Sequence, residues 1–319
     1  MIVKQRRRSS KLKVLYYLLE ALPESHPVVE QVKEEVLFSA PGERGEESLD
    51  FHLDYLDPPF LILHNLRLFD GLHYFQIDTL LMFPQFILLL EVKNISGELT
   101  YDTDHHQLIR TKDGDRVSFP DSIEQVDRQQ ILLKKWLRKN CAFSLPVESL
   151  VVLASAKSPV EITGDNRKEA GERMVRRHSL LSRVKQLRNT VIGEEKSMEE
   201  LSKVAHRLKS AHEPYVFNYR ERFKLSYEDL HLGVRCPDCH RYRMKWQQAK
   251  WLCRFCGEQS KDVHHYALER FSYLVSETIS NREAREFLGI ESRYIVKRLL
   301  KHYPLVEKGA KKGARYQLR

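Results

Sequence analysis

One stretch constrains the fold more than any other, FQIDTLLMFPQFILLLEVKN at residues 75–94. Two apolar runs flank a Pro-Gln pair, a pattern typical of an antiparallel hairpin. If the hairpin is symmetric about that pair, Asp78 faces Glu91 directly. Lys93 then lies on the same face as Glu91, because side chains alternate along a strand. Charged groups among packed apolar side chains are costly unless they are paired or bind a metal. The hairpin therefore predicts that these three charged side chains pair with one another or bind a metal ion.

Two opposed carboxylates on one face of a hairpin repel each other. A divalent cation removes this penalty, because Mg²⁺ takes oxygen ligands from one or two carboxylates together with water and phosphate. Lys93 is then placed to hold a nucleophilic water or to stabilise charge that develops on a phosphate. The alternative is a solvated strand end whose charges share no function. On the first interpretation, Asp78 and Glu91 are candidate ligands of Mg²⁺ or Mn²⁺.

Further motifs around the hairpin resemble a known family. GERGEES (residues 42–48), QID (76–78), EVKN (91–94) with a following glycine, and a helix with a Pro…Gln pattern resemble the nuclease-related domain, NERD, of the PD-(D/E)XK nuclease superfamily. The resemblance covers residues 39 to 155. It implies an α/β core with a central mixed sheet flanked by helices, and a metal-dependent phosphodiesterase site. The site residues that it implies are Glu46, Asp78, Glu91, Lys93 and Gln125, with Asp78 and Glu91 as metal ligands and Lys93 as the catalytic lysine.

A second glutamine can fill the position that Gln125 occupies in this pattern. Gln129 lies one helical turn after Gln125 and can share or take its role.

Two CxxC pairs lie in the C-terminal third of the chain, with thirteen residues between them. Each pair forms a turn with two thiolates directed at one centre, and two such turns complete a tetrahedral zinc site. A site with four cysteine ligands has no open position, so the zinc is structural. His240, His264 and His265 are less favoured substitute ligands. The predicted ligands are Cys236, Cys239, Cys253 and Cys256, and their thiol chemistry predicts a reducing compartment, the cytoplasm.

Basic residues alternate with aromatic ones around these cysteines, in the stretch HRYRMKWQQAKWLCRF. Such a surface can grip nucleic acid by charge and stacking. The alternative is that Trp246 and Trp251 pack the zinc ribbon against its neighbours. The sequence supports the two interpretations equally.

The last forty residues predict a helix-turn-helix. Ser280 and Glu283 form a capping box, Gly289 ends the first helix, and Ser292 can cap the second. A basic, glycine-containing hairpin follows, so the region resembles a winged helix. Its second helix would enter a major groove and its wing would contact phosphate. The alternative is a protein-interaction module with a solvated basic face. The candidate DNA-binding residues are Arg293, Tyr294, Lys297, Arg298, Lys301, Lys308, Lys311, Lys312 and Arg315.

Charge is distributed unevenly along the chain. The formal net charge is +9, but residues 39–110 hold twelve acidic against four basic residues. Residues 282–319 hold eleven basic against four acidic residues. A basic C-terminal segment favours a polyanionic partner, and an acidic central segment suits a cation-binding centre.

These patterns divide the 319 residues into five regions. We expect a basic arm and helix at 1–38, the nuclease-related domain at 39–160, a charged helical linker at 161–232, a zinc ribbon at 233–260 and a winged helix-turn-helix at 261–319. The stretch SAPGERGEES (39–48) predicts a break between a helix over 11–38 and another over 46–56. Apolar runs are too short to span a membrane, and Glu20 interrupts the N-terminal one, so no signal peptide is expected.

The sequence thus predicts a cytoplasmic, divalent-metal-dependent DNA nuclease that zinc-ribbon and winged-helix modules target to DNA. No GxxxxGK[ST] motif is present, so motor activity would come from a protein partner. One alternative is a non-catalytic DNA-binding or regulatory protein that uses a nuclease-like scaffold, and another is RNA as the substrate. The sequence predicts neither an oligomeric state nor a strand preference.

Overall fold

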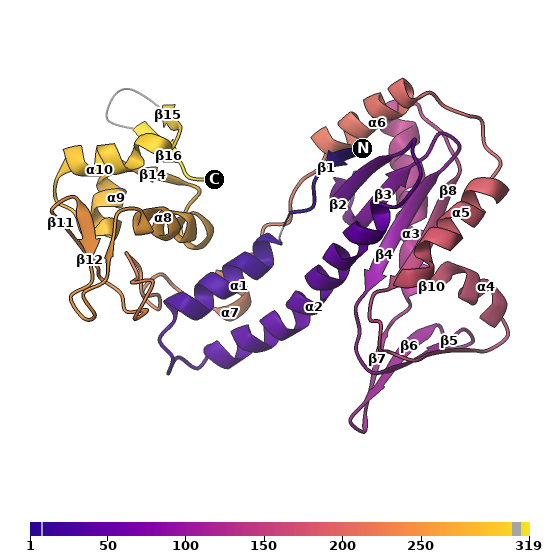
Figure 1. Cartoon of the computed structure of the whole chain (residues 1–319), viewed down its shortest axis with the longest axis horizontal. Helices are drawn as coiled ribbons and strands as arrows, with labels where there is room; N and C mark the ends of the chain where they lie inside the picture. Colours follow the sequence, from indigo (N-terminus) through magenta and orange to yellow (C-terminus); the bar gives the residue numbers. More distant parts are fainter. Residues whose placement is uncertain (8, 308–313) are drawn as a thin grey trace. The chain divides into compact units, whose positions relative to one another are not determined.

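The computed structural model describes residues 1–7, 9–307 and 314–319 and divides into two compact units (Figure 1). Residues 1–8 and 38–215 form the first unit, and residues 9–37 and 216–319 form the second. These units cut across the expected regions. The start of the chain joins the first unit because strand β1 (Ile2–Lys4) pairs in parallel with β2 (Leu61–Phe69).

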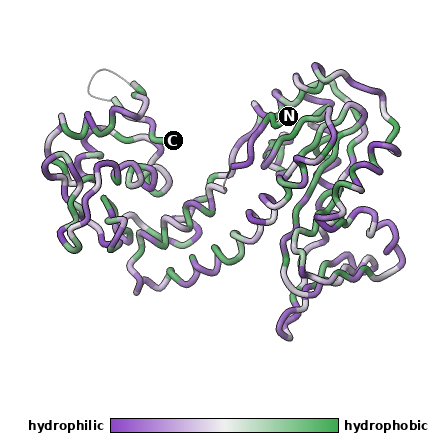
Figure 2. The backbone as a smooth tube through the Cα atoms, viewed as in Figure 1, coloured by the Kyte–Doolittle hydropathy of each residue, from purple (hydrophilic) through white to green (hydrophobic). Residues whose placement is uncertain are grey.

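The core of the first unit is a six-stranded sheet in the order β1-β2-β3-β4-β8-β10. The antiparallel pairs are β2 with β3 (Tyr74–Met82) and β3 with β4 (Ile87–Lys93). Strand β8 (Val147–Leu153) is parallel to both β4 and β10 (Met174–Arg176). The sheet is therefore mixed, as expected, and hydrophobic colour follows its central strands in Figure 2.

Helices cover both faces of this sheet, which confirms the predicted α/β class. Helices α3 (Ser122–Cys141) and α6 (Met198–Ser210) pack against one face through Leu133, Trp136, Leu201 and Leu208. The C-terminal part of α2 (Val29–Leu53) and helix α5 (Leu180–Thr190) pack against the other face. Short helices α4 (Arg167–Arg173) and η1 (Arg177–Ser179) precede α5.

A second sheet in the first unit has the order β7-β6-β5-β9. Its strands are β5 (Glu98–Asp102), β6 (Gln107–Lys112), β7 (Asp115–Pro120) and β9 (Val160–Thr163). Leu99, Tyr101 and Leu108 of this sheet share an apolar cluster with Val126 of α3. The N-terminal end of α3 is thus fixed between the two sheets.

The expected helix break at residues 39–48 is wrong, because α2 runs through Pro41 without interruption. Tertiary contacts explain why this segment remains helical. Gly45 packs so closely against Asn94 that a Cβ at this glycine would lie 2.4 Å from the Asn94 Cβ. The Asn94 side chain also donates to the Pro41 carbonyl at 2.8 Å. The glycine therefore allows α2 to dock on the residue that follows β4, and packing overrides the weak helix propensity.

The register of the β3–β4 hairpin agrees with the symmetry inferred from the sequence. The structure pairs Thr79 with Leu90 and Met82 with Ile87 around the Pro-Gln turn. The ladder stops there, one position before Asp78 would face Glu91. On its other side, β3 pairs with β2 on both sides of Asp78 but not at Asp78 itself, opposite Asn65. Asn65 has a positive φ of 47°, so both strands are irregular at this point.

The second unit contains α1 (Ser10–Ala21), the N-terminal part of α2, and α7 (Tyr219–Phe223). Strands β11 (Lys245–Gln247), β12 (Lys250–Leu252) and β13 (Gln259–Ser260) form an antiparallel sheet beside the cysteines. There follow α8 (Val263–Leu274), β14 (Thr278–Ser280), α9 (Asn281–Leu288), α10 (Arg293–Leu299), η2 (Leu300–His302), β15 (Leu305–Glu307) and β16 (Ala314–Gln317). The order of the last sheet is β14-β16-β15. Across the described ranges, no helix has the length and apolarity needed to cross a membrane.

Candidate metal and nucleic-acid sites

Asp78 lies at the irregular point of β3, where the strand ladders on both sides are interrupted. Its side chain is only 9% exposed, and its Oδ2 accepts a hydrogen bond from the backbone N–H of Val92 at 2.9 Å. The carboxylate thus takes a backbone donor of β4 that would otherwise belong to the ladder. The irregularity opens the hairpin at the position where the sequence places its two opposed carboxylates.

Glu91, on β4, is held by two side chains with different roles. Its Oε1 accepts from Lys93 Nζ at 2.8 Å, and its Oε2 accepts from Gln129 Nε2 at 3.0 Å. Lys93 also donates to Oε1 of Gln125 at 2.8 Å. The structure therefore brings Glu91, Lys93 and both candidate glutamines of α3 together. Gln125 accepts from the lysine, whereas Gln129 donates to the glutamate, so the two glutamines contact different candidate residues.

Glu46 extends toward the same site from α2. It contacts residues that the sequence patterns do not indicate. Its Oε2 accepts from Arg6 NH1 at 2.8 Å and also from the Asn65 side chain. Arg6 also forms a bidentate pair with Asp50, one turn further along α2. No local motif marks these partners. Arg6 belongs to the basic run that the sequence predicts as an N-terminal arm, and Asn65 interrupts an apolar strand.

The electrostatics of the three carboxyl groups show that they share one environment. Burial raises the pKa of Asp78 well above its usual value, and the negative charges of Glu91 and Glu46 raise it further. Burial also raises the pKa of Glu46, and the charge of Glu91 adds to this effect, whereas Arg6 and Asn65 oppose it. Mutual repulsion of this kind is relieved by a bound cation.

The donor set fits a hard divalent cation held by two carboxylates. Asp78 and Glu91 offer oxygens from adjacent strands, and Mg²⁺ commonly takes one or two carboxylates and completes its shell with water and phosphate. In the part of the chain that the structure describes, Glu46, Asp78 and Glu91 do not place three ligand atoms within 4.8 Å of one another. Each of these carboxylates is turned toward a protein donor instead. Asp78 and Glu91, which the hairpin pattern selects, remain the candidate ligands, and Glu46 is a candidate outer carboxylate.

The four cysteines of the second unit converge on one point. Their sulfurs all lie within 4.8 Å of one another, with Sγ–Sγ distances of 3.6 Å for Cys236–Cys256 and 3.5 Å for Cys239–Cys253. Four sulfurs at tetrahedral corners, each about 2.3 Å from zinc, would be roughly 3.8 Å apart. These distances are compatible with a zinc ion held by the four cysteines.

The histidines and tryptophans near these cysteines have structural contacts. Trp251 is fully buried, packs edge-on against Trp246 and donates from Nε1 to Nδ1 of His264 at 3.3 Å. Packing therefore accounts for Trp251. Phe255 remains half exposed, and the guanidinium groups of Arg241 and Arg254 lie over its ring.

The candidate DNA-binding residues of α10 form one exposed group. The capping box of Ser280 with Glu283, the left-handed Gly289 and the Ser292 cap are all present and set the two helices as predicted. The exposed members on α10 and η2 are Arg293, Tyr294, Lys297, Arg298 and Lys301. Lys308, Lys311 and Lys312 lie outside the described residues. Arg315 donates to Thr278 and pairs with Glu283 at 2.8 Å, so its guanidinium is engaged within the module.

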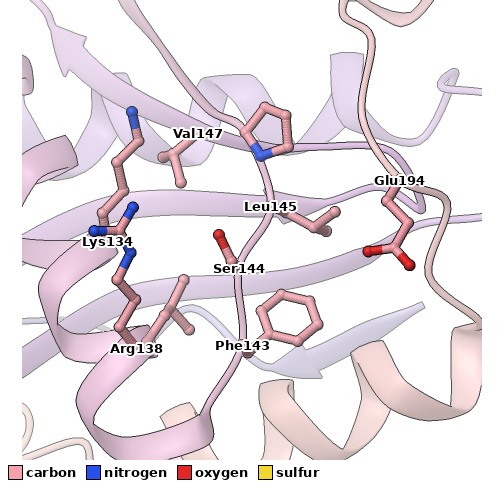
Figure 3. A pocket seen from close by; sticks show the side chains of 9 residues that line it. Lys134, Arg138, Phe143, Ser144, Leu145, Val147 and Glu194 are labelled. Carbon is pink, nitrogen blue, oxygen red and sulfur yellow. The ribbon is translucent and has the colours of Figure 1, made fainter.

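Two further features involve groups other than the candidate site residues. A cavity of about 460 Å³ in the first unit is lined on one side by Lys134 and Arg138 of α3 and on another by Glu194, and none of the candidate site residues lines it (Figure 3). His106, Asp121 and Glu124 also place ligand atoms within 4.8 Å of one another. However, Asp121 already caps α3 and accepts from the Tyr101 hydroxyl. These contacts explain the Asp121 carboxylate without a metal.

The architecture and the carboxylate site define a nuclease-like α/β core. In agreement, residues 41–154 match the family model of the nuclease-related domain. The chain therefore contains a nuclease-related domain, and the matched segment includes Glu46, Asp78, Glu91, Lys93 and Gln125. Neither a search of curated proteins nor a search of solved structures found a match to this chain.

Proposed function

We propose that this protein is a divalent-metal-dependent DNA nuclease. The observation that carries the proposal is the position of Lys93 at the opened end of the hairpin. Its ammonium group lies 2.8 Å from both Glu91 Oε1 and Gln125 Oε1, beside the buried Asp78. The match to the nuclease-related domain supports a phosphodiester as the substrate.

The residues of the site have separate tasks in this proposal. A bound Mg²⁺ or Mn²⁺ would supply charge stabilisation and a water of lowered pKa. Asp78 and Glu91 would hold the ion, and Gln129 would fix the orientation of Glu91. Lys93, aimed by Gln125, would donate hydrogen bonds to the attacking water or to the phosphate oxygen on which charge increases in the transition state.

The second unit supports DNA as the target. The order α8-β14-α9-α10-β15-β16 resembles a winged helix, in which α10 would be the recognition helix. Its exposed basic residues, together with Arg241 and Arg254 around Phe255, would contact phosphates and bases. The cysteine cluster would hold a structural zinc ion, which suits a reducing compartment such as the cytoplasm.

One specific observation favours a second candidate, a non-catalytic DNA-binding protein on a nuclease-like scaffold. All three carboxylates already have protein donors: Val92 for Asp78, Lys93 and Gln129 for Glu91, and Arg6 and Asn65 for Glu46. A scaffold of this kind can satisfy the hydrogen bonding of its buried carboxyl groups without a metal.

Cleavage assays distinguish the two candidates. Single-stranded, duplex and branched DNA would be incubated with Mg²⁺, with Mn²⁺ and with EDTA. The wild type, Asp78→Ala and the exposed-carboxylate control Asp115→Ala would run side by side. We expect metal-dependent cutting by the wild type and the control and none by Asp78→Ala. DNA binding without cutting under any of these conditions would favour the scaffold.

A further inference from the structure

Arg6 lies outside the segment that matches the nuclease-related domain, yet it reaches the candidate site. It follows β1, which adds a parallel strand to the edge of the sheet. Lys4, at the end of β1, donates from Nζ to the carbonyls of His64 at 2.7 Å and Asn65 at 3.0 Å. These two carbonyls belong to the irregular point of β2. The N-terminal segment is thus fixed to the sheet at the position opposite Asp78.

The guanidinium of Arg6 makes a dense set of contacts. Its side chain is 8% exposed. It donates to Oε2 of Glu46 at 2.8 Å, to both oxygens of Asp50, to Oγ1 of Thr79 at 3.1 Å and to Nδ1 of His64 at 2.9 Å. An arginine has only donors, so Nδ1 of His64 must accept, and the imidazole is neutral. The contacts join α2 to strands β2 and β3 through one planar group.

These contacts select which oxygen of Glu46 is left available. Arg6 and Asn65 both donate to Oε2. Among the described residues, Oε1 of Glu46 accepts no hydrogen bond from any donor. The carboxylate is therefore held at one oxygen and open at the other, the arrangement by which outer hydrogen bonds orient metal-site carboxylates.

The charge of Arg6 is balanced where it would otherwise oppose a cation. An unpaired guanidinium beside a divalent ion would weaken its binding, because like charges repel strongly in a poorly solvated site. Asp50 offsets this charge by accepting from Nε at 3.1 Å and from NH2 at 2.8 Å. Arg6 thus supplies Glu46 with a hydrogen bond while the pair with Asp50 stays close to neutral.

We propose that Arg6 is a positioning residue of the metal site, which with Asn65 holds Glu46 so that its free oxygen faces the ion or its water shell. This inference rests on the proposed function. It adds to the site a residue from the N-terminal segment, so the site is complete only when β1 is in place. Arg6 acts through Glu46 and does not touch the reacting atoms.

The test measures Mn²⁺ binding to the full-length protein by calorimetry without DNA, together with kcat and KM for DNA cleavage. Removing an outer hydrogen bond from a metal site typically costs about 10- to 100-fold in affinity or activity. We expect Arg6→Gln to weaken Mn²⁺ binding by about tenfold or more and to lower kcat with little change in KM. Arg7→Gln is the matched control, since Arg7 is the exposed neighbour and loses the same charge. It should bind Mn²⁺ as the wild type does.

Thermal unfolding without metal separates positioning from folding. Arg6→Lys keeps the charge but cannot make the bidentate contact with Asp50 while also reaching Glu46, so Mn²⁺ affinity should lie between wild type and Arg6→Gln. If Arg6→Gln does not fold, Arg6→Lys alone decides. Wild-type Mn²⁺ affinity in a variant with a lowered melting temperature would overturn the inference and leave the proposed function standing. A wild type that neither binds Mn²⁺ nor cuts DNA would overturn both.

Discussion

The carboxylate site of the first unit and the cysteine cluster of the second hold their candidate ligands in opposite ways. Asp78 accepts from a backbone N–H, Glu91 accepts from Lys93, and Glu46 accepts from Arg6. The cysteine sulfurs instead face one another at 3.5 and 3.6 Å.

This difference follows from the chemistry of the ligands. Carboxylates are strong acceptors, so arginine, lysine and amide donors can replace part of what a cation supplies. Thiols are weak donors and weak acceptors, so a group of four gains little from its own contacts. We therefore expect the first site to fold without its metal and the second to need zinc.

The largest expected effect is the loss of zinc from the cysteine cluster. Cys239→Ser should release the ion and unfold the surrounding strands, since structural zinc contributes on the order of 10 kcal/mol to folding in small zinc modules. Zinc content by mass spectrometry and the fluorescence of the Trp246–Trp251 pair would report the loss. Cys141→Ser, which removes the remaining cysteine, should retain stoichiometric zinc. Full zinc content in Cys239→Ser would contradict the four-cysteine site.

Lys93→Ala tests whether Lys93 takes part in DNA cleavage or only offsets the charge of Glu91 in place of a cation. We expect kcat for DNA cleavage to fall by about 10²- to 10³-fold, as when one donor to a developing negative charge is removed. DNA affinity, measured by fluorescence anisotropy, should stay within about twofold, because in the proposed function the second unit would supply most phosphate contacts. Lys134→Ala on α3 is the control. Lost DNA binding in a folded Lys93→Ala protein would count against a catalytic lysine.

His64 gives the folding stability of the first unit a pH dependence that does not require a metal. Burial, followed by the positive charge of Arg6, lowers the pKa of His64 to about 4, while Asp50 opposes this shift and Lys4 adds to it. The unfolded chain gains a proton near pH 6.5 and the folded chain only near pH 4. The stabilising contribution is therefore complete above pH 6.5 and falls as the pH decreases toward 4, by about 3 kcal/mol in total.

Denaturant unfolding between pH 7 and pH 4 would measure this contribution. His64→Asn keeps an acceptor for Arg6 but has no proton to gain, so its stability should change less over this range than that of the wild type. His206→Asn, at an exposed histidine of α6, should follow the wild-type curve. Equal pH slopes for the wild type and His64→Asn would refute a buried, neutral imidazole.

Most of the structural features that the sequence predicts depend on short local patterns. The hairpin register depends on one turn, the cysteine cluster on two spacings, and the caps at Ser280 and Ser292 on three-residue motifs. Each of these features is set by residues that are close in sequence or by a single strong ligand chemistry. The same local hairpin pattern makes Asp78, Glu91 and Lys93 the candidate residues of the site.

The remaining features depend on tertiary contacts that no local pattern encodes. Arg6 and Glu46 are separated by 40 positions, and Arg6 and Thr79 by 73. Helix α2 continues through Pro41 because Gly45 fits against Asn94. Regular strand pairing also fails at Asn65 and Asp78, where the β2–β3 ladder is interrupted and the β3–β4 ladder ends. In each case the fold, rather than propensity, places the residue beside the site.

The smallest expected effect concerns the proposed division of tasks, in which the first unit would cut DNA and the second would bind it. Replacing Lys297 and Arg298 with alanine removes two exposed cations of α10, so the slope of log K against log salt should become shallower by about 2. At saturating DNA, kcat should be unchanged, because neither residue belongs to the carboxylate site. Arg315→Gln is the comparison, since that guanidinium pairs with Glu283 and its loss should affect stability more than the slope. An unchanged slope in the double variant would exclude α10 as the DNA-contacting helix and assign DNA binding to another surface.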